Sequence, residues 1–133
     1  MKLTSRSEYA LLALVYLARH QQEGLIPAQA IAAAQEIPLR FLEQILLILS
    51  RARYLRSSKG KGGGFQLRKP ASKISLAEVI RLFDGALAPT ESASKYFYEP
   101  TPIEKEAKLL GVFREVRDYV ARKMEKTTLA DMA

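Results

Sequence analysis

The chain has 133 residues, carries a formal net charge of +7 at pH 7, and contains neither cysteine nor tryptophan. The absence of cysteine excludes disulfides, thiolate catalysis, cysteine-based zinc sites and cysteine-ligated iron–sulfur clusters. The longest uninterrupted apolar run covers ten residues, 9–18, which is too short for the ~20 that cross a bilayer. No secretory-signal pattern opens the chain, so we expect a cytoplasmic protein with no membrane partner.

The positive charge belongs to one segment of the chain. Residues 44–77 contain eight lysines or arginines and no acid. Elsewhere the charges nearly cancel, because residues 1–43 hold four bases and four acids and residues 78–133 hold nine bases and ten acids. A segment this long without an acid is a candidate for contacting nucleic-acid phosphates. A solvated basic face is the alternative.

The first part of the chain predicts three helices. Ser5-x-x-Glu8 has the form of a capping box and would begin a helix that reaches about His20. A shorter helix is expected over residues 27–35, and a third over residues 38–52 after a break that contains proline. The apolar residues of the third helix recur at three- and four-residue steps and are expected to face the core; they are Phe41, Leu42, Ile45, Leu46 and Leu49. The second and third helices together fit a helix-turn-helix.

The next segment predicts a β-hairpin with a basic tip. Residues 54–58 and 65–68 alternate as short strands do, and residues 59–64 between them contain four glycines and two lysines. Glycines at the tip would let the backbone approach another surface closely. A nucleotide-binding P-loop is a poor match, because Phe65 follows the last glycine where that motif needs Lys-Ser/Thr and a helix.

A fourth helix and a loop follow the hairpin. Ser75-x-x-Glu78 is a second capping box, and the helix that it begins should end at Gly85. Residues 86–101 have no helical or strand period and are expected to form a loop, with an aromatic cluster at residues 96–98. These aromatic side chains could stack on a small effector or could fill the core of a dimer interface.

The end of the chain predicts a long helix. Thr101, Pro102 and Glu104 suit the first turn of a helix that would reach about Lys126, and residues 127–131 would begin a last short helix. Its apolar stripe, ~30 Å long by helical rise, consists of Ile103, Ala107, Leu110, Phe113, Val116, Val120 and Met124. One small domain rarely covers so long a stripe, so we expect dimerisation through this helix. Packing on the chain's own domain is the alternative.

These elements, in this order, resemble the Rrf-two family of winged helix-turn-helix transcription regulators. The resemblance covers essentially the whole chain and is carried by residues 7–11, 16–18, 37–46, 61–67 with Pro70, 74–80 and 128–131. Two motifs are specific in combination: Leu42-Glu43-Gln44-Ile45-Leu46 in the third helix and Lys61-Gly62-Gly63-Gly64 in the hairpin.

The resemblance implies a mainly helical fold with a small hairpin wing. Residues 1–85 would form a winged helix-turn-helix domain that binds double-stranded DNA, residues 86–101 a sensor or effector loop, and residues 102–133 the dimerisation helix and tail. The expected function is that of a homodimeric, sequence-specific regulator, a repressor by preference, with the third helix in the major groove and the wing in the neighbouring minor groove.

Side-chain chemistry agrees with this arrangement in the third helix, where the residues facing DNA would be Pro38, Arg40, Glu43 and Gln44. Arg40 can bond guanine or a phosphate, Gln44 can pair with adenine, and Glu43 can accept a hydrogen bond from cytosine. The alternative for Glu43 is an ion pair with Arg40 on a solvated helix face.

The remaining DNA contacts would come from two groups of residues. In the wing they are Lys59, Gly60, Lys61, Gly62 and Gly63, which suit a narrow, electronegative minor groove. The backbone phosphates would be contacted by Lys2, Ser5, Arg6, Arg51, Arg53 and Arg56.

The chain departs from the family at its sensor. Cluster-binding members carry three cysteines in the loop before the long helix, whereas this chain has only Ser92 near the first position, and serine does not replace a soft thiolate ligand. The only histidine, His20, is expected to interact with the end of its helix. We therefore expect no cluster and no other cofactor. The signal would come from a small effector near Ser92, Tyr96, Phe97 and Tyr98, or from a partner enzyme, as in the family branch that uses cysteine synthase.

A second function remains open from the sequence, namely a helical protein that binds a partner through its long helix and binds nucleic acid non-specifically through its basic hairpin. An enzyme is not expected, because no nucleophile–base pair, metal-ligand set or paired acids can be identified.

Overall fold

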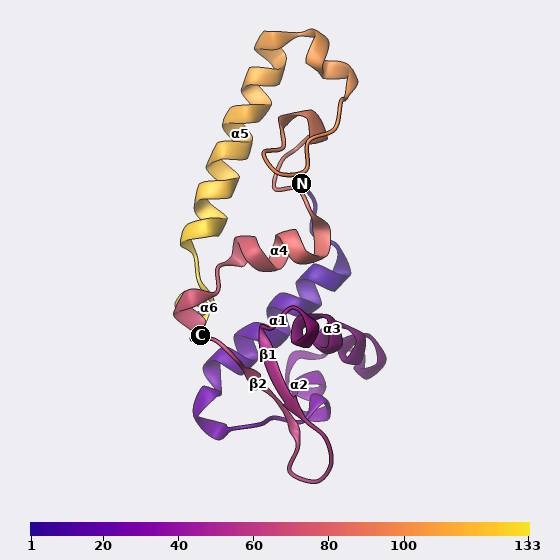
Figure 1. Ribbon diagram of the computed structural model, residues 1–133, viewed down its shortest axis with the longest axis vertical. Helices are drawn as coiled ribbons and strands as arrows, with labels where there is room; N and C mark the ends of the chain where they lie inside the picture. The colour runs from indigo at the N-terminus through magenta and orange to yellow at the C-terminus, as the bar shows by residue number, and fades with distance from the viewer.

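The computed structural model describes residues 1–133, and it confirms a mainly helical fold with one small hairpin. The helices are α1 (Ser5–Arg19), α2 (Ala28–Gln35), α3 (Leu39–Arg51), α4 (Leu76–Asp84), α5 (Ala107–Lys126) and α6 (Leu129–Met132), and the strands are β1 (Leu55–Ser58) and β2 (Gly64–Leu67). The molecule is elongated, with α1 to α3 and the hairpin at one end and α5 along the other (Figure 1). No helix combines the length and the apolar character that a membrane span requires.

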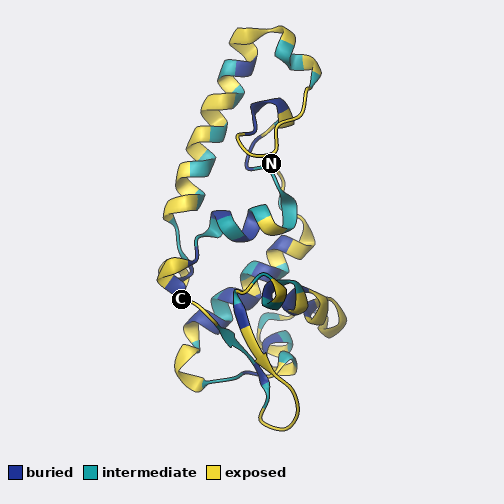
Figure 2. Ribbon diagram, viewed as in Figure 1, coloured by how far each residue is buried: buried dark blue, intermediate teal, exposed yellow.

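Helix α1 runs through the main hydrophobic core, where it packs against α2, α3, α4 and α6. The core is a cluster of 17 buried residues, and α1 contributes Ala10, Ala13, Leu14, Leu17 and Ala18 to it. Burial of each large apolar side chain stabilises the fold by about 1.5–3 kcal/mol. Most buried residues lie at this end of the molecule, whereas α5 is largely exposed (Figure 2).

The start of α1 corrects one prediction, because the N-cap is Thr4 and not Ser5. The Thr4 hydroxyl accepts a hydrogen bond from the Ser7 backbone N–H at 3.3 Å. Thr4 is held in place from the far end of α4, since its backbone N–H and its hydroxyl donate to the two carboxylate oxygens of Asp84 at 3.1 and 2.6 Å. This contact ties the beginning of α1 to the end of α4.

The ionisation of Asp84 supports the same contact. Partial burial raises the pKa of Asp84, but the hydrogen bonds from Thr4 and the charge of Arg6 outweigh it and hold the pKa below its ordinary value of 3.8. Because the pKa is lowered in the folded state, the carboxylate stabilises the fold at pH values above its ordinary pKa. This stabilisation is lost as the pH falls through the lowered pKa.

Replacing this carboxylate should therefore have a pH-dependent cost. We expect Asp84→Asn to lower the free energy of unfolding by about 1 kcal/mol near neutral pH, because one charged acceptor of the Thr4 cap is lost. The difference from the wild type should shrink once the pH falls below the ordinary value of 3.8. Urea unfolding of both proteins at several pH values measures it, with the exposed Glu99→Gln as a control that should change little. A difference that does not vary with pH would contradict this account.

The turn between α2 and α3 sets the direction of α3. Glu36 ends α2 in the left-handed conformation at φ 54°, and Ile37 is buried in the core. Pro38 then stands at the N-cap position of α3. Beneath α3, four of the five residues predicted to face the core do so, namely Leu42, Ile45, Leu46 and Leu49.

The prediction for the fifth residue, Phe41, is wrong, because its side chain is 53% exposed. The physical reason is its place on the helix. Phe41 comes one position before Leu42, at the edge of the apolar arc, so it stays outside the core in which Ile45 and Leu46 are buried.

The hairpin is anchored by a third extended segment that the sequence did not reveal. Strands β1 and β2 are antiparallel, with Leu55 paired to Leu67 and Ser58 to Gly64. Ile26, just before α2, exchanges two backbone hydrogen bonds with Phe65 at 2.9 and 2.8 Å. These bonds fix the wing, residues 55–67, to the helix-turn-helix.

Helix α4 begins as predicted. Ser75 and Glu78 form a complete capping box, with the Glu78 N–H donating to the Ser75 hydroxyl at 3.2 Å and the Ser75 N–H donating to the Glu78 carboxylate at 2.8 Å. Gly85 ends the helix at φ 80°, in the left-handed region that glycine tolerates best.

The long helix begins later than predicted, because Pro102–Lys105 forms a 3-10 turn and α5 starts at Ala107. The groups expected to cap it have other partners. The Thr101 hydroxyl is hydrogen-bonded to Ser92 and, at 3.2 Å, to Thr90, and the Glu104 carboxylate accepts from the Tyr98 hydroxyl. These bonds hold the loop before α5 in place.

The chain returns to the main core at its end. Thr128 pairs with Ser75 in an isolated β-bridge and caps α6 through a capping box with Asp131. Leu129 is fully buried in the same core as α1. Helix α5 is therefore attached at both ends, through the loop and through α6.

Candidate nucleic-acid interface

Helix α3 presents a row of exposed polar residues on the side away from the core. Pro38, Arg40, Glu43 and Gln44 are all exposed. None of the four salt bridges in the structure includes Arg40 or Glu43, so the alternative of an ion pair between them is not supported. Because Leu42 and Ile45 are buried beneath, the orientation of this polar row is fixed by core packing.

On one side of the row, the start of α1 lies against α3. Ser5, Arg6 and Tyr9 of α1 line a hollow of about 420 Å³ together with Phe41, Gln44 and Ile45 of α3. Two of the predicted phosphate contacts, Ser5 and Arg6, therefore adjoin the predicted base-reading Gln44. The Arg6 guanidinium also lies over the Phe83 ring, with its central carbon 5.7 Å from the ring centroid.

On the other side of the row, the wing lies against α3. Glu43, Leu47 and Ser50 of α3 line a second hollow with Ser57, Ser58 and Lys59 of the hairpin, and its volume is about 310 Å³. The Ser50 hydroxyl is buried and has no hydrogen-bond partner. The structure thus places α3 between the start of α1 and the base of the wing.

The wing tip is open and basic. Lys59, Gly60, Lys61 and Gly62 are exposed and Gly63 is half-buried. Gly60 and Gly62 have φ of 85° and 79° with no atoms within 4 Å of an added Cβ, so the tip is shaped by conformations that glycine adopts at little cost.

The remaining predicted backbone contacts are exposed, and they are Lys2, Arg51, Arg53 and Arg56. Neither hollow beside α3 includes them. Arg53 is in the left-handed conformation, with φ 68°.

One basic residue of the same segment has a structural partner. The Lys69 ammonium lies 4.8 Å from the centroid of the Tyr54 ring and 4.0 Å from the Glu78 carboxylate. The Tyr54 hydroxyl donates to the same carboxylate at 3.1 Å. Burial, followed by the charge and the hydrogen bond of Glu78, raises the pKa of Tyr54 to about 12. This contact fixes the base of the wing to α4.

Sequence reasoning missed two apolar residues of this surface, Phe41 and Leu47, which are 53% and 48% exposed. Each lines one of the two hollows. An apolar residue on an amphipathic helix is normally assigned to the core, so only its position at the edge of the apolar arc could have indicated exposure.

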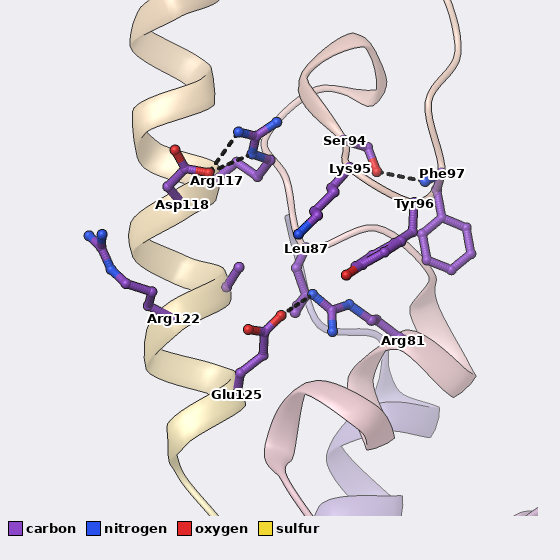
Figure 3. A pocket seen from close by; sticks show the side chains of 11 residues that line it. Arg81, Leu87, Ser94, Lys95, Tyr96, Phe97, Arg117, Asp118, Arg122 and Glu125 are labelled. Carbon is purple, nitrogen blue, oxygen red and sulfur yellow. Dashed lines mark hydrogen bonds and ion pairs between the residues drawn. The ribbon is translucent and has the colours of Figure 1, made fainter.

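The loop residues predicted as an effector region do not converge on one point. Ser92 is buried and hydrogen-bonded to Thr101, whereas Tyr98 is exposed and donates to Glu104. That hydrogen bond is the main cause of the raised pKa of Tyr98. Only Tyr96 and Phe97 line the cavity between the loop, α4 and α5, which Figure 3 shows.

His20 is found at the end of α1, as expected. Its backbone N–H donates to the Tyr16 carbonyl at 3.1 Å, and its ring nitrogen pairs with Glu23.

Comparison with known proteins gives a consistent result over the whole chain. Residues 3–133 match the family model Rrf2, described as an iron-dependent transcriptional regulator. An HTH-type transcriptional regulator of Mycobacterium tuberculosis is 36% identical over 136 residues, covering 100% of this chain and 81% of the relative. The solved structure of CymR, the global cysteine regulator of B. subtilis, is 26% identical with a TM-score of 0.79, covering 100% of this chain and 96% of that one. The structure of T. potens IscR is 26% identical with a TM-score of 0.76, covering 99% and 85%.

The residues of this chain do not fit the iron in that family description. The chain has no cysteine, and no group of three or more His, Cys, Asp or Glu side chains is arranged to hold a metal ion. In the loop, the hydroxyls of Ser92, Thr90 and Thr101 bond to one another, and neutral hydroxyls are poor ligands for an iron–sulfur cluster.

The family match, the relatives and the fold agree on one assignment. The relatives are transcriptional regulators and not enzymes. The chain therefore belongs to the Rrf2 (Rrf-two) family and is a DNA-binding transcriptional regulator with a winged helix-turn-helix fold.

Proposed function

We propose that the protein is a homodimeric, sequence-specific repressor that reads its operator with α3 and the wing. The observation that carries this proposal is the exposed row of Arg40, Glu43 and Gln44, which lies between the start of α1 and the base of the wing. A helix flanked in this way can enter the major groove while both flanks contact the phosphates beside it.

The chemistry of α3 suits direct reading of base edges. Gln44 can pair with adenine, Arg40 with guanine, and Glu43 can accept from cytosine. Phe41 adds an apolar contact in the same hollow as Gln44, which suits the methyl group of thymine. All four side chains are exposed, so binding does not require the core to rearrange.

The wing and its flanks supply the contacts that do not depend on sequence. Lys59 and Lys61 carry positive charge on an exposed tip rich in glycine, and such a tip suits the narrow minor groove. Each phosphate neutralised by lysine or arginine releases counterions, so affinity should fall steeply with salt.

Dimerisation through α5 is supported by an exposed apolar face, although not by the whole stripe expected from the sequence. Leu110 is buried, and Val120 and Met124 pack against the small cluster of α4 and Leu87. A second row, here called the exposed α5 stripe, has no partner in the chain; it comprises Leu109, Val112, Val116 and Tyr119, which are 44, 54, 42 and 65% exposed. Their three- and four-residue spacing forms one face that a second α5 could cover.

The signal is proposed to be a small effector or a partner protein, because the loop residues do not provide ligands for a cluster. The cavity beside Tyr96 and Phe97 is the part of the sensor region that offers space for a molecule.

Selection from random duplex DNA tests the function and the residue roles together. We expect one enriched palindrome, bound ~10³-fold or more tighter than random duplex. Gln44→Ala should change which sequences are selected, because it removes a base contact. Lys61→Ala should instead weaken binding to all sites and reduce the salt dependence.

Two outcomes would favour the competing function, a partner-binding protein with non-specific affinity for nucleic acid. The first is that no palindrome is enriched. The second is that Gln44→Ala and Lys61→Ala weaken all sites alike.

A further inference from the structure

A cavity of about 200 Å³ lies between the loop, α4 and α5 (Figure 3). In Figure 1 the loop and α5 lie toward the end of the molecule away from the wing. It is lined from α4 by Arg81, from the loop by Lys95 and Tyr96, and from α5 by Arg117 and Glu125, among others. Its volume is below the ~300–1,000 Å³ of pockets that hold drug-sized ligands, so it suits a small molecule.

The lining carries more positive than negative charge. The lining residues include four bases, Arg81, Lys95, Arg117 and Arg122, and only two acids, Asp118 and Glu125. Each acid is already paired with one arginine, since Arg81 donates to Glu125 at 2.8 Å and Arg117 donates to Asp118 at 2.7 Å. Lys95 and Arg122 take part in no salt bridge.

The two unpaired cations are placed differently. Figure 3 shows the Lys95 ammonium pointing into the cavity and Arg122 pointing away from it, on the outer side of α5. The Lys95 nitrogen is 5.3 Å from the centroid of the Tyr96 ring, and the central guanidinium carbon of Arg81 is 4.9 Å from the same centroid. Two cations thus lie close together at one aromatic ring, and their combined positive charge favours an anion.

The arginines around the cavity are held in fixed positions. Arg117 also donates to the Ala93 carbonyl at 3.0 Å, and the side chains of Arg81 and Arg117 are only 22 and 23% exposed. Guanidinium groups held in this way can bond an oxyanion without losing much side-chain entropy. Leu87, Tyr96 and Phe97 add apolar and aromatic surface beside them.

The geometry points to a binding site for a small organic anion, in which a carboxylate or phosphate is held by Lys95 with Arg81 and Arg117 while its apolar body lies beside Leu87 and Phe97. A carboxylate and a phosphate both present an oxyanion, and titration with one ligand of each kind distinguishes the two head groups. The site itself is independent of DNA binding, whereas its use in regulation rests on the proposed function.

Helix α4 offers a physical route from this site to the DNA surface. Arg81 lies on α4 one turn before Asp84, whose carboxylate holds Thr4 at the start of α1. An anion that competes with Glu125 for Arg81 would change how α4 is held against α5. Because the same helix positions the start of α1, next to Ser5 and Arg6, the anion should change the affinity for DNA.

Calorimetric titration of the full chain at constant ionic strength tests the site. The probes are benzoate, phenyl phosphate, inorganic phosphate and, as a cation of similar shape, benzylamine. Benzoate or phenyl phosphate should bind more tightly than inorganic phosphate, and benzylamine should not bind. Lys95→Gln should weaken binding about tenfold or more, because a charge-assisted hydrogen bond is lost. Lys105→Gln removes the same charge from an exposed position outside the cavity and should leave binding unchanged.

Three outcomes would overturn the inference. They are no binding of any anion up to about 10 mM, equal losses in Lys95→Gln and Lys105→Gln, or inorganic phosphate binding as well as phenyl phosphate. Circular dichroism confirms that both variants are folded.

Protein that binds benzoate but no DNA would contradict the proposed function and support this site. If benzoate binds and DNA affinity changes with it in the wild type but not in Lys95→Gln, the regulatory use is supported as well.

Discussion

Gly64→Ala should lower the free energy of unfolding by about 3 kcal/mol or more, and it should abolish DNA binding. A Cβ at this position would lie 2.4 Å from the backbone C and O atoms of Ile26 and 2.7 Å from the backbone N of Pro27, and the glycine has φ 149°. Backbone atoms cannot rotate out of the way as a flexible side chain can. The wing would therefore separate from Ile26 and lose the two hydrogen bonds that join Ile26 to Phe65.

Gly62→Ala provides a matched control in the same hairpin. Gly62 has φ 79° but nothing within 4 Å of an added Cβ, so its replacement should cost only the left-handed conformation, about 1–2 kcal/mol. Urea unfolding followed by circular dichroism gives both values, and a fluorescence titration with operator DNA measures binding. Equal stability of the two variants would show that the contact between Gly64 and Ile26 does not anchor the wing.

Local patterns in the sequence were sufficient for most of the secondary structure. The Ser75 capping box, the hairpin and the amphipathic α3 depend on residues within a few positions of one another, and the structure contains all three. The same holds for the short helix at the end, where Thr128 caps α6. Interactions of this range are set by local backbone geometry, so the sequence alone can indicate them.

The errors arise where a distant residue competes for a local group. Thr4 replaces Ser5 as the cap of α1 because Asp84, 80 positions away, binds both its N–H and its hydroxyl. Thr101 does not cap α5 because its hydroxyl bonds to Ser92 and Thr90. No local pattern contains the partner in either case, so only the folded chain shows which bond forms.

The candidate site was predictable in its polar residues and not in its apolar ones. Arg40, Glu43 and Gln44 were identified because charged and amide side chains on a helix face solvent and can read bases. Phe41 and Leu47 lie on the same surface, but their chemistry does not distinguish exposure from burial. The cavity between α4, the loop and α5 brings Arg81, Lys95 and Arg117 together from three separate segments, and this too required the fold.

Val112→Glu should convert the proposed dimer to a monomer. Val112 is 54% exposed and lies in the exposed α5 stripe with Leu109, Val116 and Tyr119. A glutamate there would bring two like charges together in an apolar interface related by twofold symmetry, where neither has a partner. Light scattering should show the mass falling from twice 14.9 kDa to 14.9 kDa, and circular dichroism should be unchanged because the side chain is exposed in the single chain.

The same variant should lose about 10²-fold or more in affinity for a palindromic operator, because a monomer contacts one half-site and the gain from linking two half-sites disappears. Ala107→Glu is the informative control. Ala107 belongs to the stripe expected from the sequence but not to the exposed α5 stripe, and it is itself exposed. If Val112→Glu alone breaks the dimer, the surface that pairs is the one left uncovered by α4. If Ala107→Glu breaks the dimer equally, the stripe expected from the sequence forms the interface. If neither variant breaks the dimer, the two chains do not associate through α5.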